Sequence, residues 1–292
     1  MQASLPQEST RNRACVVCRA ADAREPFHEG LQRCRACGYV SADLSLTDEE
    51  LSRLYDRGFF HEGDFADYAA DREYHTRNFR LRRRVLRRFL DPARHRRLLE
   101  IGSAYGFFLD VVRRDFERVL GIDLTDEGVR HTRDALGLDA VQDDFLRHDF
   151  AGERFDVTCM WDTIEHVRRP DLYLEKIAAL TEPGALLALT TGDIDSLNAR
   201  LRGRRWRLIM LPAHLHYFSA RTITRLLERH GFEVVHLEHC GYYRSALHMA
   251  YAVLAVRHGR RELFERLRRT RLLNWGFYLN LYDIMYVVAR KR

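Results

Sequence analysis

Residues 97–106 read RLLEIGSAYG, an apolar run that stops at Gly102 and is followed by a second glycine, Gly106. The run predicts a buried strand over residues 97–101, and the apolar residues after it predict a helix over 107–114. Small residues in such a turn let a ligand approach the backbone, and the first N–H groups of the helix point toward that ligand. Taken alone, the turn fits a dinucleotide site or simply a tight turn.

The alternation of strand and helix continues along the chain. Further strands are predicted at 118–122, 138–141, 155–160, 185–190, 232–239 and 282–289, with helices at 125–136, 171–180 and between Ser219 and Gly231. Strands that alternate with helices at this spacing form parallel sheets covered on both faces. The sequence therefore predicts an α/β fold with a doubly wound sheet.

Acidic residues follow the second and third predicted strands. Asp123 lies 21 residues beyond Gly102, where an acid at the carboxyl edge of a doubly wound sheet can accept both hydroxyls of a ribose. Asp144 and Phe145 follow the third strand, where an acid can accept from an adenine amino group and a ring can flank it. A helix N-cap at Asp123 and ordinary turn chemistry at Asp144 are the alternatives.

These motifs, in this order, resemble those of class I S-adenosylmethionine (SAM)-dependent methyltransferases. The resemblance rests on residues 100–106, 121–123, 144–145 and 161–167, and it extends over about residues 95–240 and the last strand. It implies a Rossmann-like sheet of seven strands, the last antiparallel, with SAM across the carboxyl edge. The SAM-binding residues that it implies are Glu100, Gly102, Ser103, Tyr105, Gly106, Asp123, Leu124, Asp144, Phe145 and Trp161. The chain departs from the family at Ala104, where a glycine is frequent.

Four cysteines near the N-terminus form the pattern C-x2-C-x15-C-x2-C, namely Cys15, Cys18, Cys34 and Cys37. Two C-x-x-C turns can place four thiolates around one tetrahedral zinc ion. Two disulfides or a redox pair are the alternatives, and neither explains two pairs in a reducing compartment. Four thiolates leave no open position on the metal, so the sequence predicts a structural zinc-ribbon module.

The predicted domain organisation has three parts. Residues 1–45 form a polar tail and the zinc module, residues 46–92 a helical linker or lid, and residues 93–292 the methyltransferase domain. Within that domain, residues 243–280 are predicted to be a basic helical insert, helical from Tyr243 to Leu273. A packing helix, a homodimer contact and a membrane-surface element are the roles that its arginines, leucines and aromatics allow.

The block over residues 190–219 resembles methyltransferases that act on sugars, polysaccharides and secondary metabolites. The sugar C-methyltransferases among them carry a glutamate directly before the counterpart of His214, where this chain has Ala213. Alanine cannot act as a base, so transfer to oxygen or nitrogen is expected. His166, His214 and His216 are the candidate bases, because histidine titrates near neutral pH, and loop packing is the structural alternative for each.

Composition adds a weaker indication of the partner. The chain has 48 Lys and Arg against 42 Asp and Glu, a net charge of +6. The expected partner is a small-molecule acceptor. It could be a phosphate-bearing nucleotide-sugar, whose phosphates the arginines between Arg200 and Arg207 would bind. The alternative is an rRNA or tRNA methyltransferase whose zinc module and basic surface hold RNA. With neither a signal peptide nor an apolar stretch long enough for a membrane span, a cytoplasmic protein is expected.

Overall fold

The structure is a computed structural model that describes the chain except residues 1–13, 22, 45–70, 271 and 274. The predicted polar tail and most of the predicted helical linker or lid at 46–92 lie outside the described residues. Within the described ranges, no helix is long and apolar enough to span a membrane.

The main sheet has seven strands in the order β10-β13-β8-β7-β4-β5-β6. Their bounds are β4 (Arg97–Ile101), β5 (Arg118–Asp123), β6 (Asp139–Gln142), β7 (Val157–Trp161), β8 (Leu186–Gly192), β10 (Phe232–His239) and β13 (Ile284–Lys291). Strands β4 to β8 pair in parallel, whereas β13 runs antiparallel to both β8 and β10. The predicted doubly wound sheet with an antiparallel last strand is confirmed.

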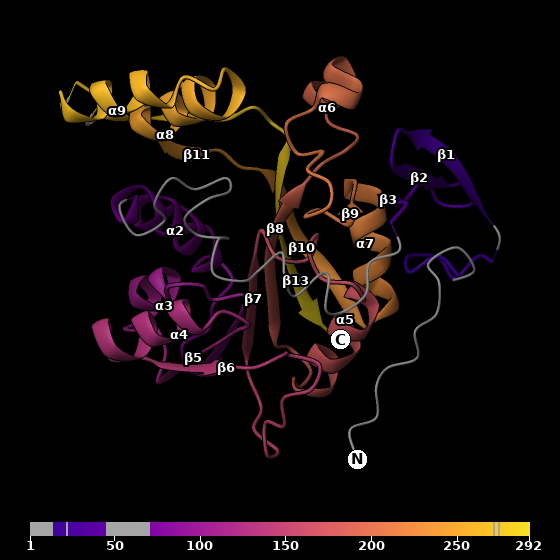
Figure 1. Cartoon of the computed structure of the whole chain (residues 1–292). Coiled ribbons are helices and arrows are strands. Elements are labelled where there is room, and N and C mark those ends of the chain that lie inside the picture. Colours follow the sequence, from indigo (N-terminus) through magenta and orange to yellow (C-terminus); the bar gives the residue numbers. More distant parts are fainter. Residues whose placement is uncertain (1–13, 22, 45–70, 271, 274) are drawn as a thin grey trace, which may run out of the picture.

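Helices cover both faces of this sheet (Figure 1). One face carries α2 (Arg72–Leu86), α3 (Phe107–Val112) and α4 (Asp126–Arg130), the last continuing as a π-helical turn, η2 (His131–Ala135); the other carries α5 (Pro170–Ala179) and α7 (Ala220–Arg229). Adjacent residues of a strand point to opposite faces. Leu98 accordingly packs in the core under α2 and α3, and its neighbour Leu99 in the core under α5 and α7.

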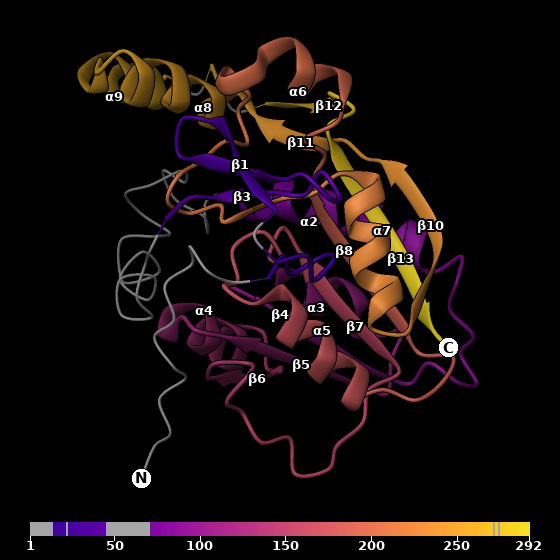
Figure 2. The same cartoon turned by 90° about the vertical axis from the view of Figure 1, so that its right-hand side faces the viewer.

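The N-terminal cysteine segment shares a sheet with the larger domain. Strands β1 (Arg24–His28), β2 (Leu31–Cys34) and β3 (Val40–Ala42) are joined by β9 (His216–Tyr217), and Figure 2 shows β1 and β3 in the upper part of the molecule. Cysteine side chains of this segment pack in the same apolar cluster as residues of α7. The segment is therefore built onto the methyltransferase-like domain and shares its core.

The insert between β10 and β13 differs from its prediction. It comprises β11 (Tyr242–Ser245), α8 (Ala246–Ala250), a π-helical segment η4 (Tyr251–Arg257), α9 (Arg261–Arg269) and β12 (Gly276–Leu279). The expected helix from Tyr243 onward is wrong at its start, because Tyr243 pairs with Tyr278 across a two-stranded sheet. Cross-strand aromatic pairs favour strands, and the helix begins only after Ser245, whose side chain accepts from the His248 amide.

Candidate active site

The turn after β4 contains three residues with left-handed backbone. Gly102, Ala104 and Gly106 have φ angles of 75°, 44° and 69°, in the left-handed region. A Cβ on Gly102 would lie 2.7 Å from Oγ1 of Thr163, so no side chain fits there. Ala104, where the family frequently has glycine, therefore adopts a backbone conformation that favours glycine. Its N–H donates a 2.7 Å hydrogen bond to Asp123 Oδ2, which holds the residue in place.

Asp123 is the residue that ties this turn to β5. Its Oδ1 accepts from the Thr125 backbone N–H at 2.9 Å and from the Thr125 hydroxyl, while Oδ2 accepts from Ala104. Burial raises the pKa of Asp123, and the donors of Thr125 and Ala104 offset part of that effect. The carboxylate is therefore held in one orientation at the carboxyl edge of the sheet, where a ribose was predicted.

Two buried polar atoms beside the turn have no hydrogen-bond partner in the described part of the chain. They are Oε2 of Glu100 and Oγ of Ser103, in side chains that are 2% and 4% exposed. Burial, and then the negative charge of Asp123, raise the pKa of Glu100 well above its usual range. Unpartnered buried polar groups are rare in folded proteins, so these atoms fit a polar ligand that this turn would bind.

The remaining predicted SAM residues occupy different environments. Tyr105 is buried and donates its hydroxyl to Glu127, whereas Leu124 is 50% exposed at the edge of the sheet. Asp144 caps its own loop by accepting from the Leu146 N–H at 2.7 Å. All three remain predicted cofactor residues.

Phe145 and Trp161 are both placed in the core. Phe145 is 2% exposed and packs against Phe150 and Tyr173. Trp161 is 6% exposed and packs against Phe108, yet its Nε1 has no partner among the described residues. Both stay predicted cofactor residues, and Trp161 Nε1 is a buried donor that a ligand could use.

Beyond β7, the backbone turns sharply at Asp162, whose φ is 48°. The Asp162 carboxylate accepts from the Thr190 hydroxyl at 2.9 Å and pairs with Arg82 of α2 at 2.7 Å. Burial alone would raise the pKa of Asp162, but the charge of Arg82 and the hydrogen bond from Thr190 outweigh that effect and lower the pKa of this carboxyl group. A fixed negative charge thus lies between the cofactor turn and the predicted bases.

Glu165, His166 and His214 converge directly after this turn. One ligand-type atom of each side chain lies within 4.8 Å of the others, and the two imidazole rings meet edge to face at 4.6 Å. Because a carbonyl can only accept, Nδ1 of His166 donates to the Ala213 carbonyl at 3.0 Å. We call these three residues the acceptor cluster.

Burial controls the protonation of the acceptor cluster. Burial lowers the pKa of His166 below its usual value. Burial, together with the nearby His166, lowers the pKa of His214 to about 3. It raises the pKa of Glu165 to about 8, aided by the charge of Asp162, and Glu165 Oε2 has no partner within the described structure. At neutral pH the cluster therefore holds two neutral imidazoles and a mostly protonated carboxyl group.

His216 does not belong to the acceptor cluster. Its Nε2 donates to the Val167 carbonyl at 2.7 Å, and its Nδ1 accepts from the hydroxyl of Tyr39. Burial lowers its pKa to about 4. With both ring nitrogens bonded to the protein, His216 cannot take a proton from a substrate, so its prediction as a base is corrected.

The four cysteines lie together as predicted. The Cys15 and Cys37 sulfurs are 3.7 Å apart, the Cys18 and Cys34 sulfurs 3.6 Å apart, and all four lie within 4.8 Å of one another. Zinc–sulfur bonds of about 2.3 Å in a tetrahedron require sulfurs about 3.8 Å apart. A hydrogen bond from Cys37 lowers the pKa of Cys15 to about 5, which favours one thiolate before any metal binds. The four side chains therefore fit one zinc ion.

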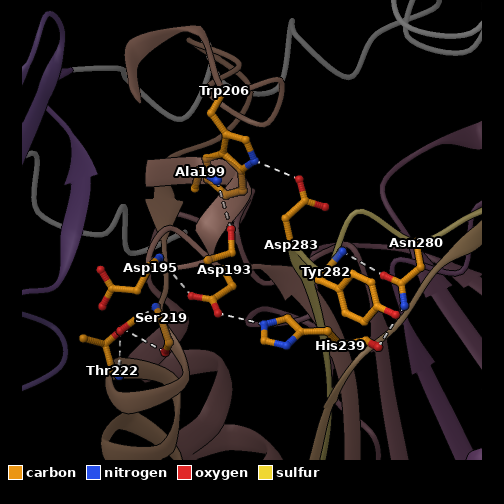
Figure 3. Close-up of polar contacts among 11 residues, drawn as sticks. Asp193, Asp195, Ala199, Trp206, Ser219, Thr222, His239, Asn280, Tyr282 and Asp283 are labelled. Atoms are coloured by element: carbon orange, nitrogen blue, oxygen red, sulfur yellow. Dashed lines mark hydrogen bonds and ion pairs between the residues drawn. The ribbon is translucent and has the colours of Figure 1, made fainter. Parts of the chain in front are cut away.

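The arginine-rich segment after β8 is partly structural. It contains α6 (Leu197–Arg202) and a 3-10 turn, η3 (Gly203–Arg205), and it is fixed to β13 through Asp283, which is 1% exposed. Asp283 accepts from Trp206 Nε1 at 2.9 Å, as Figure 3 shows, and from Arg207 at 2.7 Å. Nearby, His239 contacts Asp193 at 2.9 Å. Arg207 thus has a structural partner, while Arg204 and Arg205 are exposed.

Comparison with known proteins agrees with this geometry. A family model described as "Methyltransferase domain" matches residues 72–237, more than half of the chain. The fold and the cofactor turn define the Rossmann-like methyltransferase class, for which SAM is the methyl donor. The chain belongs to this methyltransferase-domain family.

Curated relatives match the same region. A ubiquinone biosynthesis O-methyltransferase of Agrobacterium fabrum is 28% identical over 53% of this chain and 69% of its own length. One of Cereibacter sphaeroides is 30% identical over 44% of this chain and 55% of its own length. The chain spans about half the length of most of these relatives.

Solved structures show the fold alone. The [4+2]-cyclase SpnF is 19% identical with a TM-score of 0.51, covering 73% of this chain and 81% of SpnF. A chain from the complex of the Haloferax volcanii Trm112 methyltransferase activator with a methyltransferase is 14% identical with a TM-score of 0.52, covering 83% of this chain and 97% of that one. One of these folds belongs to a protein named as a cyclase, so the reaction has to be argued from the site.

Sequence reasoning missed three residues of this site. Arg82 reaches Asp162 from a helix 80 residues earlier in the chain, which no local pattern indicates. Tyr39 meets His216 across 177 residues. Glu165 did have a signal, since an acid beside a histidine after a buried strand is a candidate for proton transfer.

Proposed function

We propose that the chain is an O-methyltransferase that methylates a hydroxyl group of a small-molecule acceptor, a sugar, nucleotide-sugar or other natural product. The observation that carries this proposal is the acceptor cluster, whose neutral His166 lies in the segment after β7, the segment in which Thr163 contacts the cofactor turn at Gly102. The names of the curated relatives support oxygen as the acceptor atom. Ala213 supports it as well, because it replaces the base that carbon methylation of the sugar type would require.

On the donor side, the residues present fit SAM. Glu100 and Ser103 offer buried polar atoms, Gly102 and Gly106 allow a left-handed turn in which no side chain fits, and Asp123 ends β5 at the carboxyl edge of the sheet, where it can accept ribose hydroxyls. When bound, SAM supplies an electrophilic methyl group on a sulfonium. The protein has to orient the acceptor oxygen in line with that methyl group and exclude competing water.

On the acceptor side, His166 is the proposed general base. Its Nδ1–H donates to the Ala213 carbonyl, which fixes the tautomer with the lone pair on Nε2, the atom proposed to receive the acceptor proton. Protonation of His166 is tolerated because Asp162 lies nearby and raises the His166 pKa. Neutral Glu165 donates a hydrogen bond to the acceptor oxygen, and His214 packs against His166 and holds its ring.

The cysteine module is proposed to bind one structural zinc ion through Cys15, Cys18, Cys34 and Cys37. The sulfur spacing supports this assignment, and four thiolates leave no position for a substrate. The metal would stabilise a segment too short to build a core alone.

Turnover with a panel of acceptors tests the proposed function. Purified zinc-loaded protein is incubated with SAM and with hydroxylated sugars, nucleotide-sugars and phenols, and the products are examined by mass spectrometry for a gain of one methyl group. We expect methylation at oxygen, at a rate that His166→Asn lowers about a hundredfold. Methylation only at carbon or nitrogen, or His166→Asn turning over as wild type does, would contradict the proposal. Retained activity after weakly bound divalent cations are removed, with the cysteine-bound zinc still in place, separates proton transfer by the cluster from a requirement for a divalent cation, which a carboxylate and two histidines are also able to bind.

A further inference from the structure

The cysteine module and the acceptor cluster are joined by one continuous sheet. Strand β3 pairs antiparallel with β9, placing Val40 opposite Tyr217 and Ser41 opposite His216. The Ala42 N–H donates to the Leu215 carbonyl at 2.9 Å. Because β9 begins two residues after His214, the module borders the segment that carries one member of the acceptor cluster.

Tyr39 is held by the second cysteine turn itself. The Cys34 N–H donates to the Tyr39 carbonyl at 2.7 Å, and the Gly38 N–H donates to the Cys34 carbonyl at 2.7 Å. Tyr39 is 5% exposed, and its ring lies 5.6 Å from that of Phe218. The position of the Tyr39 hydroxyl therefore follows the geometry of the cysteine turn.

From Tyr39, a fixed chain of hydrogen bonds reaches the loop of the acceptor cluster. The Val167 carbonyl can only accept, so His216 must carry its proton on Nε2. His216 Nδ1 is then an acceptor, and the Tyr39 hydroxyl must be its donor. The direction of both bonds follows from the carbonyl, and Val167 is the direct neighbour of His166.

The same loop is bonded to the β9 segment at further points. The N–H groups of Leu215 and His216 both donate to the Glu165 carbonyl, at 2.8 and 3.1 Å. His166 Nδ1 donates to the Ala213 carbonyl at 3.0 Å. A shift of His216 would therefore move the backbone of Glu165 and the bond that fixes the tautomer of His166.

We propose that Tyr39 and His216 are positioning residues through which the four-cysteine module sets the geometry of the acceptor cluster. This inference rests on the proposed function for its catalytic consequence and on the zinc proposal for its origin. Zinc holds the turn, the turn holds Tyr39, and His216 passes that constraint to Glu165 and His166. Loss of the metal then lowers methyl transfer while the donor side, on β4 to β6, is unchanged.

Two single substitutions separate positioning from docking. Tyr39→Phe keeps the buried ring but removes the hydroxyl that donates to His216. Arg229→Gln is the matched control, because Arg229 attaches the module to α7 through the Val16 and Val17 carbonyls, at 2.7 and 2.6 Å, without touching the acceptor cluster. Each variant is assayed for zinc content, S-adenosylhomocysteine (SAH) affinity, kcat and acceptor KM.

We expect Tyr39→Phe to retain one zinc per chain and wild-type SAH affinity within about twofold, with kcat reduced roughly tenfold. Arg229→Gln should keep a kcat within about twofold of wild type. Equal losses of kcat in the two variants, or no loss in Tyr39→Phe, would overturn the proposal.

Hydrogen exchange supplies a readout that does not depend on turnover. The amides of Leu215 and His216 should exchange at least about tenfold faster after zinc is removed from wild-type protein by a chelator, and also in Tyr39→Phe, while the Ala104 amide is unchanged. Protection that persists at Leu215 and His216 without zinc would refute the coupling even if Tyr39→Phe failed to fold. Absence of any methyl transfer by wild-type protein would instead refute the proposed function, and the exchange result would still decide the coupling.

Discussion

The donor and acceptor sides of this site lie at the same edge of one sheet but are constructed differently. The donor side is built from residues close in the chain, where a turn of three left-handed residues is held by Asp123, 19 residues beyond Ala104. The acceptor cluster joins His166 to a segment 47 residues away and depends on the cysteine module beyond it. The first is set by local backbone chemistry, and the second by tertiary contacts. Substitutions should therefore affect SAH binding on one side and turnover on the other.

The largest expected effect is on the donor side. Gly102→Val places a β-branched residue at a φ of 75° and against Thr163, which costs about 3 kcal/mol and lowers SAH affinity at least about a hundredfold. Gly152→Val is the control, since Gly152 also has a positive φ but no atom within 4 Å of an added Cβ. Calorimetric titration with SAH measures both, and tight binding by Gly102→Val would show that the turn does not contact the cofactor.

On the acceptor side, His166→Ala should lower kcat about a hundredfold, because it removes the proton acceptor. SAH affinity should stay within about twofold of wild type. His230→Ala, at the end of α7, is the control for loss of a partly buried histidine and should turn over normally. If His166→Ala lowered both kcat and SAH affinity, the proposal that the donor side and the acceptor cluster act separately would be contradicted.

Glu165 should make stability fall as pH rises. Burial raises its folded pKa to about 8 from a usual value near 4.5, so between those values the folded chain binds more protons than the unfolded chain. Glu165→Gln removes this titration and should stabilise the protein by about 1–3 kcal/mol at pH 9 but little at pH 4. Thermal melts at the two pH values measure the difference, and an equal change at both would contradict a buried, neutral carboxyl group.

The smallest expected effect is a shift in a pH profile. Since burial lowers the pKa of His166, the acidic limb of the kcat/KM profile should lie below the usual histidine pKa of about 6.5, where the histidine becomes protonated. Asp162 raises that pKa, so Asp162→Asn should move the acidic limb further down. An acidic limb that moves upward in Asp162→Asn would exclude His166 as the titrating base.

The sequence predicted what depends on neighbours in the chain. The seven strands of the main sheet follow from short apolar runs, and the cofactor turn from its glycines. The cysteine cluster follows from two C-x-x-C pairs. Each of these features needs only local spacing to be recognised.

What the sequence did not predict depends on distant partners. The insert was expected to be helical from Tyr243, but Tyr243 pairs with Tyr278 in a two-stranded sheet. His216 was a candidate base in the sequence, but its two ring nitrogens are hydrogen-bonded to Tyr39 and Val167, which lie 177 and 49 residues away. Phe145 packs against Tyr173, a contact that the residues around it do not indicate. A one-dimensional pattern cannot report such contacts.

The most direct test of the account is calorimetric titration of SAH into zinc-loaded wild type, Asp123→Asn and Asp126→Asn. Asp126 is an exposed acid at the start of α4, and its side chain pairs only with Arg130 among the ion pairs of the described residues. We expect micromolar binding by wild type and Asp126→Asn and a loss of at least about tenfold in Asp123→Asn, because a neutral amide accepts ribose hydroxyls less strongly. No binding by folded wild-type protein, or equal binding by all three, would contradict a methyl-donor site at this edge of the sheet.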